Sequence, residues 1–234
     1  MNWKSSVILL FFTLVFSSVH AENSYQEMNK LYEAKSYENL AKRCKADLKK
    51  DPQSLQDLYF LAFARLGQGK MDKAVPVMKA FEKLHDEREA ELTRQKGKTF
   101  ILIDSLYVDL YFVLGQYHVR QGEYDKAFPW LYKAKSRYIE DPYLHFFLGR
   151  CYAGQGKWEE ARKSFQKEWE LNAQDPSPLY NIACSYAAEG REKKALEWLK
   201  KAIQAHPDYK EEAAKDDSFK EISHTKGFKD LTAP

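Results

Sequence analysis

The chain of 234 residues has little glycine and proline, ten and eight residues respectively, and three cysteines. So few turn-forming residues argue against an all-β protein and leave room for long helices. The 37 basic and 34 acidic residues are spread along the chain with no basic block, so the sequence lacks the pattern of phosphate contacts typical of nucleic-acid binding. With 44% hydrophobic and 30% charged residues, the composition also argues against a disordered tail and a polytopic membrane protein.

One long apolar run stands at the beginning of the chain. Lys4 precedes the run Val7–Phe16, and residues 17–21 (SSVHA) have the pattern of a small-residue cleavage site. Ten apolar residues fall short of the ~20 that a membrane-spanning helix needs, which argues against an uncleaved anchor. We therefore expect residues 1–21 to be a signal peptide cleaved after Ala21, with no membrane span left afterwards. No cysteine follows the run to carry a lipid, so the sequence predicts a secreted or periplasmic protein.

The cysteines are Cys44, Cys151 and Cys184. Three is an odd number for an exported protein, so at least one of them cannot pair within the chain. Disulfides are therefore not expected to organise the fold, and the plainest interpretation is that all three are small buried residues. Whether any two of them pair stays open.

A repeat of 34 residues is the dominant internal pattern. Five columns recur at this spacing in three successive units, and each column keeps its chemical type. The columns are Leu114, Leu148 and Ile182; Gly115, Gly149 and Ala183; Gly122, Gly156 and Gly190; Ala127, Ala161 and Ala195; and Leu131, Phe165 and Leu199. Such a period is typical of stacked units, each of which covers an apolar face of its neighbour.

Each unit has the pattern of two amphipathic helices separated by a glycine. In residues 142–175, apolar residues follow helical spacing up to Gly156, and a second apolar stripe begins at Trp158. The glycine is expected to end the first helix in the left-handed conformation. Ala161 in the second helix would allow two helices to approach closely, with Phe165 filling the groove beside it.

This pattern resembles the tetratricopeptide repeat, whose signature is W-x2-L-G-x2-Y, then A-x3-F, then P. The matching residues of the last unit are Leu179, Ile182, Ala183, Tyr186, Ala195, Leu199 and Pro207. Departures include His145 in the Trp place and Glu168 where a small residue is usual. The resemblance covers about residues 24–209. It implies an all-α, right-handed superhelical solenoid of antiparallel helix pairs with a C-terminal capping helix.

We therefore expect a solenoid over residues 22–209, followed by residues 210–234 as a cap and tail. Its units span about residues 22–54, 55–88, 108–141, 142–175 and 176–209, and the first of them matches the repeat pattern poorly. Nineteen extra residues interrupt the period, and residues 89–107 are expected to form a helical hairpin with Gly97 at its turn. The apolar stretch Phe100–Val113 either folds back on its own repeats or offers a surface for self-association or a partner.

The resemblance implies that first helices of successive units line a concave groove for a protein or peptide partner. Family contacts come mostly from the second, fifth, ninth, twelfth and thirteenth positions of a unit. The candidate ligand-binding residues are therefore Tyr59, Phe63, Phe112, Gln116, Arg120, Phe146, Arg150, Tyr180 and Cys184. Those at the fifth positions are all aromatic, and they could equally pack between neighbouring helices. Family members that grip the C-terminal carboxylate of cytosolic heat-shock chaperones have Lys or Arg there, so that role is not expected.

The sequence gives no comparable sign of catalysis. Its six histidines are scattered, and it has no HExxH motif, no CxxC motif and no phosphate-binding glycine loop. We expect no enzyme activity, no cofactor and no metal. The remote alternative is a thiol enzyme in which His118 activates Cys151, although both stand in places that are normally core. His145 is expected to be a core residue, because a zinc site needs three or four converging ligands.

Overall fold

The structure, a computed structural model, describes residues 19–97, 101–104 and 106–233. Almost all of the predicted signal peptide therefore lies outside the described residues. The described part is all-α, without a strand, and the chain divides into two compact units, Met1–Leu110 (unit 1) and Tyr111–Pro234 (unit 2). Among the described helices, none combines the length and the hydropathy needed to cross a membrane.

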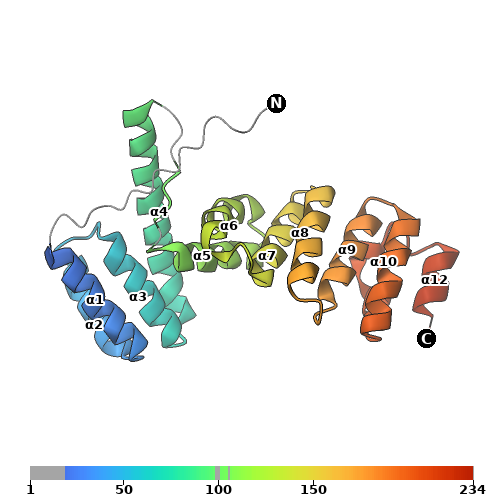
Figure 1. Cartoon of the computed structure of the whole chain (residues 1–234), viewed down its shortest axis with the longest axis horizontal. Helices are drawn as coiled ribbons and strands as arrows, with labels where there is room; N and C mark the ends of the chain where they lie inside the picture. The colour runs from blue at the N-terminus through green and yellow to red at the C-terminus, as the bar shows by residue number, and fades with distance from the viewer. Residues whose placement is uncertain (1–18, 98–100, 105, 234) are drawn as a thin grey trace. The chain divides into compact units, whose positions relative to one another are not determined.

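Unit 1 contains two helix pairs. They are α1 (Val19–Glu33) with α2 (Tyr37–Leu48), and α3 (Leu55–Gly67) with α4 (Met71–Lys96) (Figure 1). Helix α2 packs on α3, and α3 packs on α4. The first repeat forms a helix pair with a buried core, in which Met28 of α1 and Leu40 and Cys44 of α2 are fully buried. A core of this kind stabilises the pair even though its sequence matches the repeat pattern poorly.

Helix α5 (Val108–Arg120) begins in unit 1, and most of it belongs to unit 2. The next helices are α6 (Tyr124–Tyr138), α7 (Pro142–Gly154), α8 (Trp158–Leu171), α9 (Ser177–Ala188) and α10 (Glu192–Ala205). The chain then forms α11 (Tyr209–Lys215), the short 3-10 helix η1 (Asp217–Phe219) and α12 (Lys226–Thr232). From α6 to α10 each helix packs on the next, so successive pairs share apolar faces as a solenoid requires.

The repeat glycines end the first helices, as predicted. Gly122, Gly156 and Gly190 have φ angles of 74°, 71° and 66°. After Gly156, the N–H of Lys157 donates to the carbonyl oxygen of Tyr152 at 2.9 Å, which closes the last turn of α7. A residue with a Cβ is strained in this conformation, which explains why glycine recurs at this place in these three units.

The small residues of the first helices allow close approach within a pair. A Cβ atom on Gly115 would collide with the side chain of Leu131, and one on Gly149 would collide with the ring of Phe165. Ala161, one turn before Phe165, is fully buried. The large side chain of the second helix thus fills the space above the small residue of the first.

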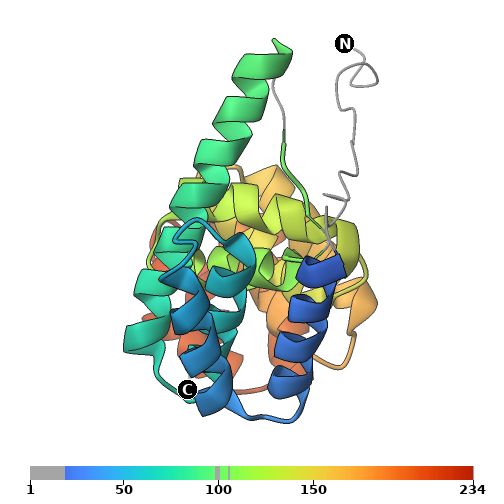
Figure 2. The same cartoon turned by 90° about the vertical axis from the view of Figure 1, so that its left-hand side faces the viewer.

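The insertion is helical on its outgoing side. Helix α4 continues to Lys96, and Gly97 ends it with a φ of 65°, as predicted. Figure 2 shows the last turns of α4 extending beyond the neighbouring helices of unit 1. Residues 101–104 of the returning side are not helical, so the prediction of a two-helix hairpin is wrong there.

Asp104 gives a physical reason for the non-helical return. Its Oδ1 atom accepts the N–H of Leu106 at 2.9 Å, and its carbonyl oxygen accepts the N–H of Tyr107 at 3.0 Å. Such local side-chain bonds compete with helix formation. The ring of Tyr107 then packs against Tyr59 and Phe81 at centroid distances of 5.5 and 5.3 Å. At this residue the apolar stretch folds back on its own repeats.

The C-terminal segment forms a cap with an apolar inner side. Phe219, Ile222 and Phe228 are buried together with residues of the last helix pair, including Leu179 and Leu199. Burial of three large side chains contributes about 2 kcal/mol each to folding. The cap therefore extends the core of unit 2, whereas its charged sequence had indicated mainly a solvating surface.

Candidate functional site

A groove in unit 2 brings together four of the predicted binding residues, Phe146, Arg150, Tyr180 and Cys184. It has a volume of about 560 Å³ and is formed largely by α7, α9 and the cap. We call it the α9 groove. Its lining also includes Tyr124, Trp158, Ser177, Asn181, Tyr209, Glu212, Asp216 and Ser218. Four of the predicted residues thus line the repeat side of this groove, and none of the predicted residues lies on its cap side.

The α7 side of the groove has an exposed cation above an aromatic ring. The guanidinium carbon of Arg150 lies 5.9 Å from the ring centroid of Phe146. The Phe146 ring is half-buried and packs edge-on against Phe147 at 5.1 Å. In the described part of the chain Arg150 forms no ion pair, so its N–H groups are available to an anionic ligand.

Tyr180 lies under the cap and has 5% of its surface exposed. Its ring stacks on Tyr209 at 4.7 Å, and its hydroxyl donates to Asp216 Oδ2 at 2.9 Å. Burial raises the pKa of Tyr180, and the contact with Asp216 raises it further. These contacts with the chain's own C-terminal segment weigh against the predicted ligand role of Tyr180, because little of its surface is left exposed.

Cys184 also contacts the cap. Its Sγ atom lies 3.9 Å from Asp216 Oδ2, and burial raises the pKa of the thiol. Asp216 thus joins the cap to two repeat positions at once, and it accepts the N–H of Ser218 at 2.8 Å as well. No sequence signal pointed to Asp216, because the cap does not follow the repeat.

Three further predicted residues of unit 2 lie on α5, outside the lining of the groove. Phe112 stacks on Tyr138 at 4.9 Å and contacts Phe147 edge-on at 6.1 Å, so much of its ring is used in packing. Gln116 is half-buried and Arg120 is exposed. Of the aromatic residues at the fifth positions in unit 2, the α9 groove therefore contains Phe146 and Tyr180 but not Phe112.

Tyr59 and Phe63 belong to unit 1. Tyr59 has 8% of its surface exposed and contacts Phe60, Phe63 and Tyr107 at 5.1, 4.8 and 5.5 Å. Phe63 is half-buried and also meets Tyr32 edge-on at 5.7 Å. Tyr59 therefore packs between neighbouring elements, which is the alternative that the sequence left open.

A second hollow in unit 2, of about 640 Å³, lies between α8 and α10 over α9. In it the ring of Tyr186 has Arg162 at 4.2 Å and Arg191 at 5.0 Å. Glu189 pairs with both arginines, at 2.7 and 3.6 Å. Because Glu189 already pairs with both arginines, we interpret this hollow as a structural feature.

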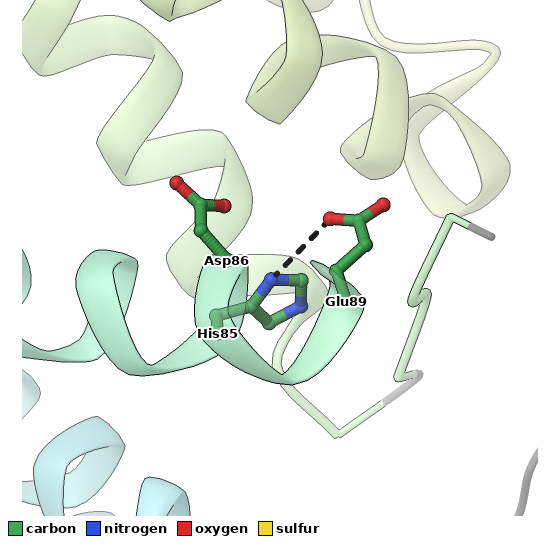
Figure 3. A group of neighbouring side chains, drawn as sticks. All are labelled: His85, Asp86 and Glu89. Carbon is green, nitrogen blue, oxygen red and sulfur yellow. Dashed lines mark ion pairs between the residues drawn. The ribbon is translucent and has the colours of Figure 1, made fainter. Parts of the chain in front are cut away.

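One cluster in the described part of the chain has the residue types of a metal site. His85, Asp86 and Glu89 of α4 have donor atoms within 4.8 Å of one another, and His85 Nδ1 lies 3.9 Å from Glu89 Oε2 (Figure 3). All three come from little more than one helical turn, and Glu89 also accepts the N–H of Leu102 at 3.1 Å. Structural zinc sites use four ligands, mostly His and Cys. We therefore assign no metal to the cluster.

The structure does not favour the thiol-enzyme alternative. Burial raises the pKa of Cys151 to about 12, whereas a thiol nucleophile needs a lowered pKa. His118 Nδ1 lies 2.7 Å from Glu123 Oε2, a contact that holds the imidazole beside a carboxylate. His145 is a core residue, as predicted, with Nε2 2.9 Å from the carbonyl oxygen of Ile139.

The stacked helix pairs and the groove across them define a helical-repeat protein. A family model described as tetratricopeptide repeat matches residues 148–210, and one described as subunit 3 of the anaphase-promoting complex, cyclosome, matches residues 103–168. The resemblance of the sequence to the tetratricopeptide repeat is thereby confirmed, with the family model covering residues 148–210.

Solved structures show the same fold. The crystal structure of YrrB, described as a TPR protein with an unusual peptide-binding site, is 22% identical with a TM-score of 0.60, over 81% of this chain and 89% of that chain. A crystal structure of the MamA protein is 19% identical with a TM-score of 0.55, over 80% and 92% of the two chains. A search of curated proteins gave no match.

Proposed function

We propose that this protein is a non-catalytic scaffold that binds a segment of a partner protein in the α9 groove. The observation that carries the proposal is the pair of Arg150 and Phe146, an exposed cation on a half-buried ring at the groove's edge. Aromatic rings provide large contact areas at low entropic cost, and arginine can bind a carboxylate through two parallel hydrogen bonds. The likeness to YrrB, which is described as having a peptide-binding site, supports the proposal.

The binding test compares three forms of the mature chain as bait in the native extracellular or periplasmic fraction. The wild type and a Lys163→Ala control should recover the same partner, because Lys163 is an exposed residue of α8 outside the groove. A Phe146→Ala/Arg150→Ala variant should recover at least about tenfold less, which corresponds to a loss of about 1.4 kcal/mol. Equal recovery by a double variant with unchanged helicity and melting temperature would reject the groove.

We further propose that the scaffold is exported after removal of residues 1–21. Helix α1 begins at Val19, so cleavage after Ala21 would shorten it by its first turn at most. Met28, the first buried side chain in the described part of α1, would stay in place. N-terminal sequencing of the exported protein should begin at Glu22, and an exported chain that retains Met1 would contradict the proposal.

A second candidate function is self-association through residues 89–113. Two observations favour it, the extension of α4 in unit 1 and the 40% exposure of Ile101. The burial of Tyr107, Val108 and Leu110 weighs against it, because much of the apolar surface is then already covered. Size-exclusion chromatography with light scattering tests self-association, because a strict monomer at high concentration rejects it.

A further inference from the structure

We infer that the α9 groove recognises the charge polarity of its ligand: an extended segment with an acidic group at the α7 side, apolar side chains in the middle and a basic group at the cap side. This inference rests on the proposed function, that the groove binds a partner segment. It adds the chemical class of that segment and its orientation relative to α7 and the cap.

The acidic preference at the α7 side follows from Arg150. This residue is exposed, lines the groove and forms no ion pair in the described part of the chain. Its guanidinium is held over the Phe146 ring, which restricts its rotamers and lowers the entropic cost of binding an anion. A carboxylate is therefore the group that this side of the groove is built to accept.

The basic preference at the cap side follows from Glu212 and Asp216. Glu212 of α11 is exposed and lines the groove, and its carboxylate has no ion-pair partner among the described residues. Asp216 lies beside it with its oxygens already bonded to Tyr180 and Ser218. Burial together with Asp175 and Glu212 raises the pKa of Tyr209 to about 12, which agrees with a negative potential around this ring. A Lys or Arg side chain fits this combination of carboxylates and an aromatic ring.

Between these two sides, residues of α9 line the groove. The side-chain amide of Asn181 lines it and makes no hydrogen bond in the described part of the chain, so it can both donate to and accept from a peptide group. Because residues of α7, α9 and the cap line the same groove, an extended segment bound there would meet all three.

The α8–α10 hollow provides a contrast within the same unit. There Glu189 neutralises Arg162 and Arg191, and Glu159 pairs with Lys163 at 2.7 Å. In the α9 groove the opposite charges of Arg150 and Glu212 belong to different elements and have no such partners among the described residues. Unpaired charges of opposite sign at the two sides of this groove give it a direction.

The experiment begins with a random peptide library selected on the full mature chain. Enriched peptides should carry an acidic and a basic residue on opposite sides of apolar or aromatic residues. One such peptide is then titrated against Arg150→Glu and Glu212→Lys, with Lys163→Glu as a matched control outside the groove. Each groove variant should weaken binding by about tenfold or more, and the control should not.

Charge exchange on the peptide makes the assignment specific to each side. Replacing the acidic residue of the peptide with Lys should restore its binding to Arg150→Glu, and replacing the basic residue with Glu should restore its binding to Glu212→Lys. Enriched peptides without this charge pattern, or binding unchanged by both reversals but lost in Phe146→Ala/Arg150→Ala, would overturn the polarity while leaving the proposed function intact. Absence of any peptide whose binding depends on Phe146 would overturn both.

Discussion

Glu168 lies on α8 where the repeat family usually has a small residue, and 6% of its surface is exposed. Its Oε2 atom has no hydrogen-bond partner in the part of the chain that the structure describes. Burial raises its pKa to about 8, with a contribution from the charge of Asp175. The folded chain therefore binds more protons than the unfolded chain between about pH 4.5 and pH 8. Across this window Glu168 makes stability fall as pH rises.

Replacement of Glu168 with Gln should remove this loss of stability at high pH. At pH 9 we expect the variant to be more stable than the wild type by roughly 3 kcal/mol, and at pH 4 the two should differ little. Urea denaturation at both pH values measures the difference. Glu170→Gln, at an exposed position of the same helix, is the matched control and should show no such change. A Glu168→Gln variant with the same pH dependence as the wild type would show that Glu168 does not titrate in this way.

At the scale of helices, two glycines of one helix pair serve different purposes. Gly156 has a positive φ with open space where a Cβ would lie, whereas Gly149 is helical and faces the Phe165 ring. Gly156→Ala should therefore cost about 1 kcal/mol from backbone strain, and Gly149→Ala about 2 kcal/mol from overpacking. Thermal unfolding of the single variants tests both values.

Truncation of the facing ring separates the two mechanisms. The next unit already combines the small residue Ala183 with Leu199, both fully buried, so an Ala–Leu pair fits this geometry. Phe165→Leu should therefore reduce the cost of Gly149→Ala, and it should leave the cost of Gly156→Ala unchanged. Equal effects on both glycines would contradict the packing explanation.

The repeat period predicted helices and their ends because it reports residues that every unit must share. It could not predict the return after α4, where a turn at Asp104 depends on a bond to the nearby N–H of Leu106. It also could not predict the cap side of the groove, because the bond from Tyr180 to Asp216 joins residues 36 positions apart outside the period. At the fifth positions the pattern gives an aromatic residue, and neighbouring contacts decide whether it packs, as at Tyr59, or borders the groove, as at Phe146.

Across the whole molecule, the thiols bear on the proposal of export. Cys44 and Cys151 are buried and Cys184 is half-buried, and none of the three forms a disulfide. Burial raises the pKa of Cys44 and Cys151 to about 12 and also raises that of Cys184, which lies beside Asp216. The thiolate is the form that reacts in disulfide exchange. An odd number of cysteines is therefore compatible with an oxidising compartment, because all three are kept protonated and poorly accessible.

This protection gives a final prediction for the intact, folded protein. The native protein should react slowly with an aromatic disulfide reagent at pH 8, and the three thiols should all react rapidly once urea unfolds the chain. Cys184, the least buried, should account for most of the slow native reaction, so Cys184→Ala should suppress it while Cys44→Ala should not. Rapid native labelling of Cys151 would contradict the burial argument and would restore the thiol-enzyme alternative, because it would require an accessible thiolate in the folded state.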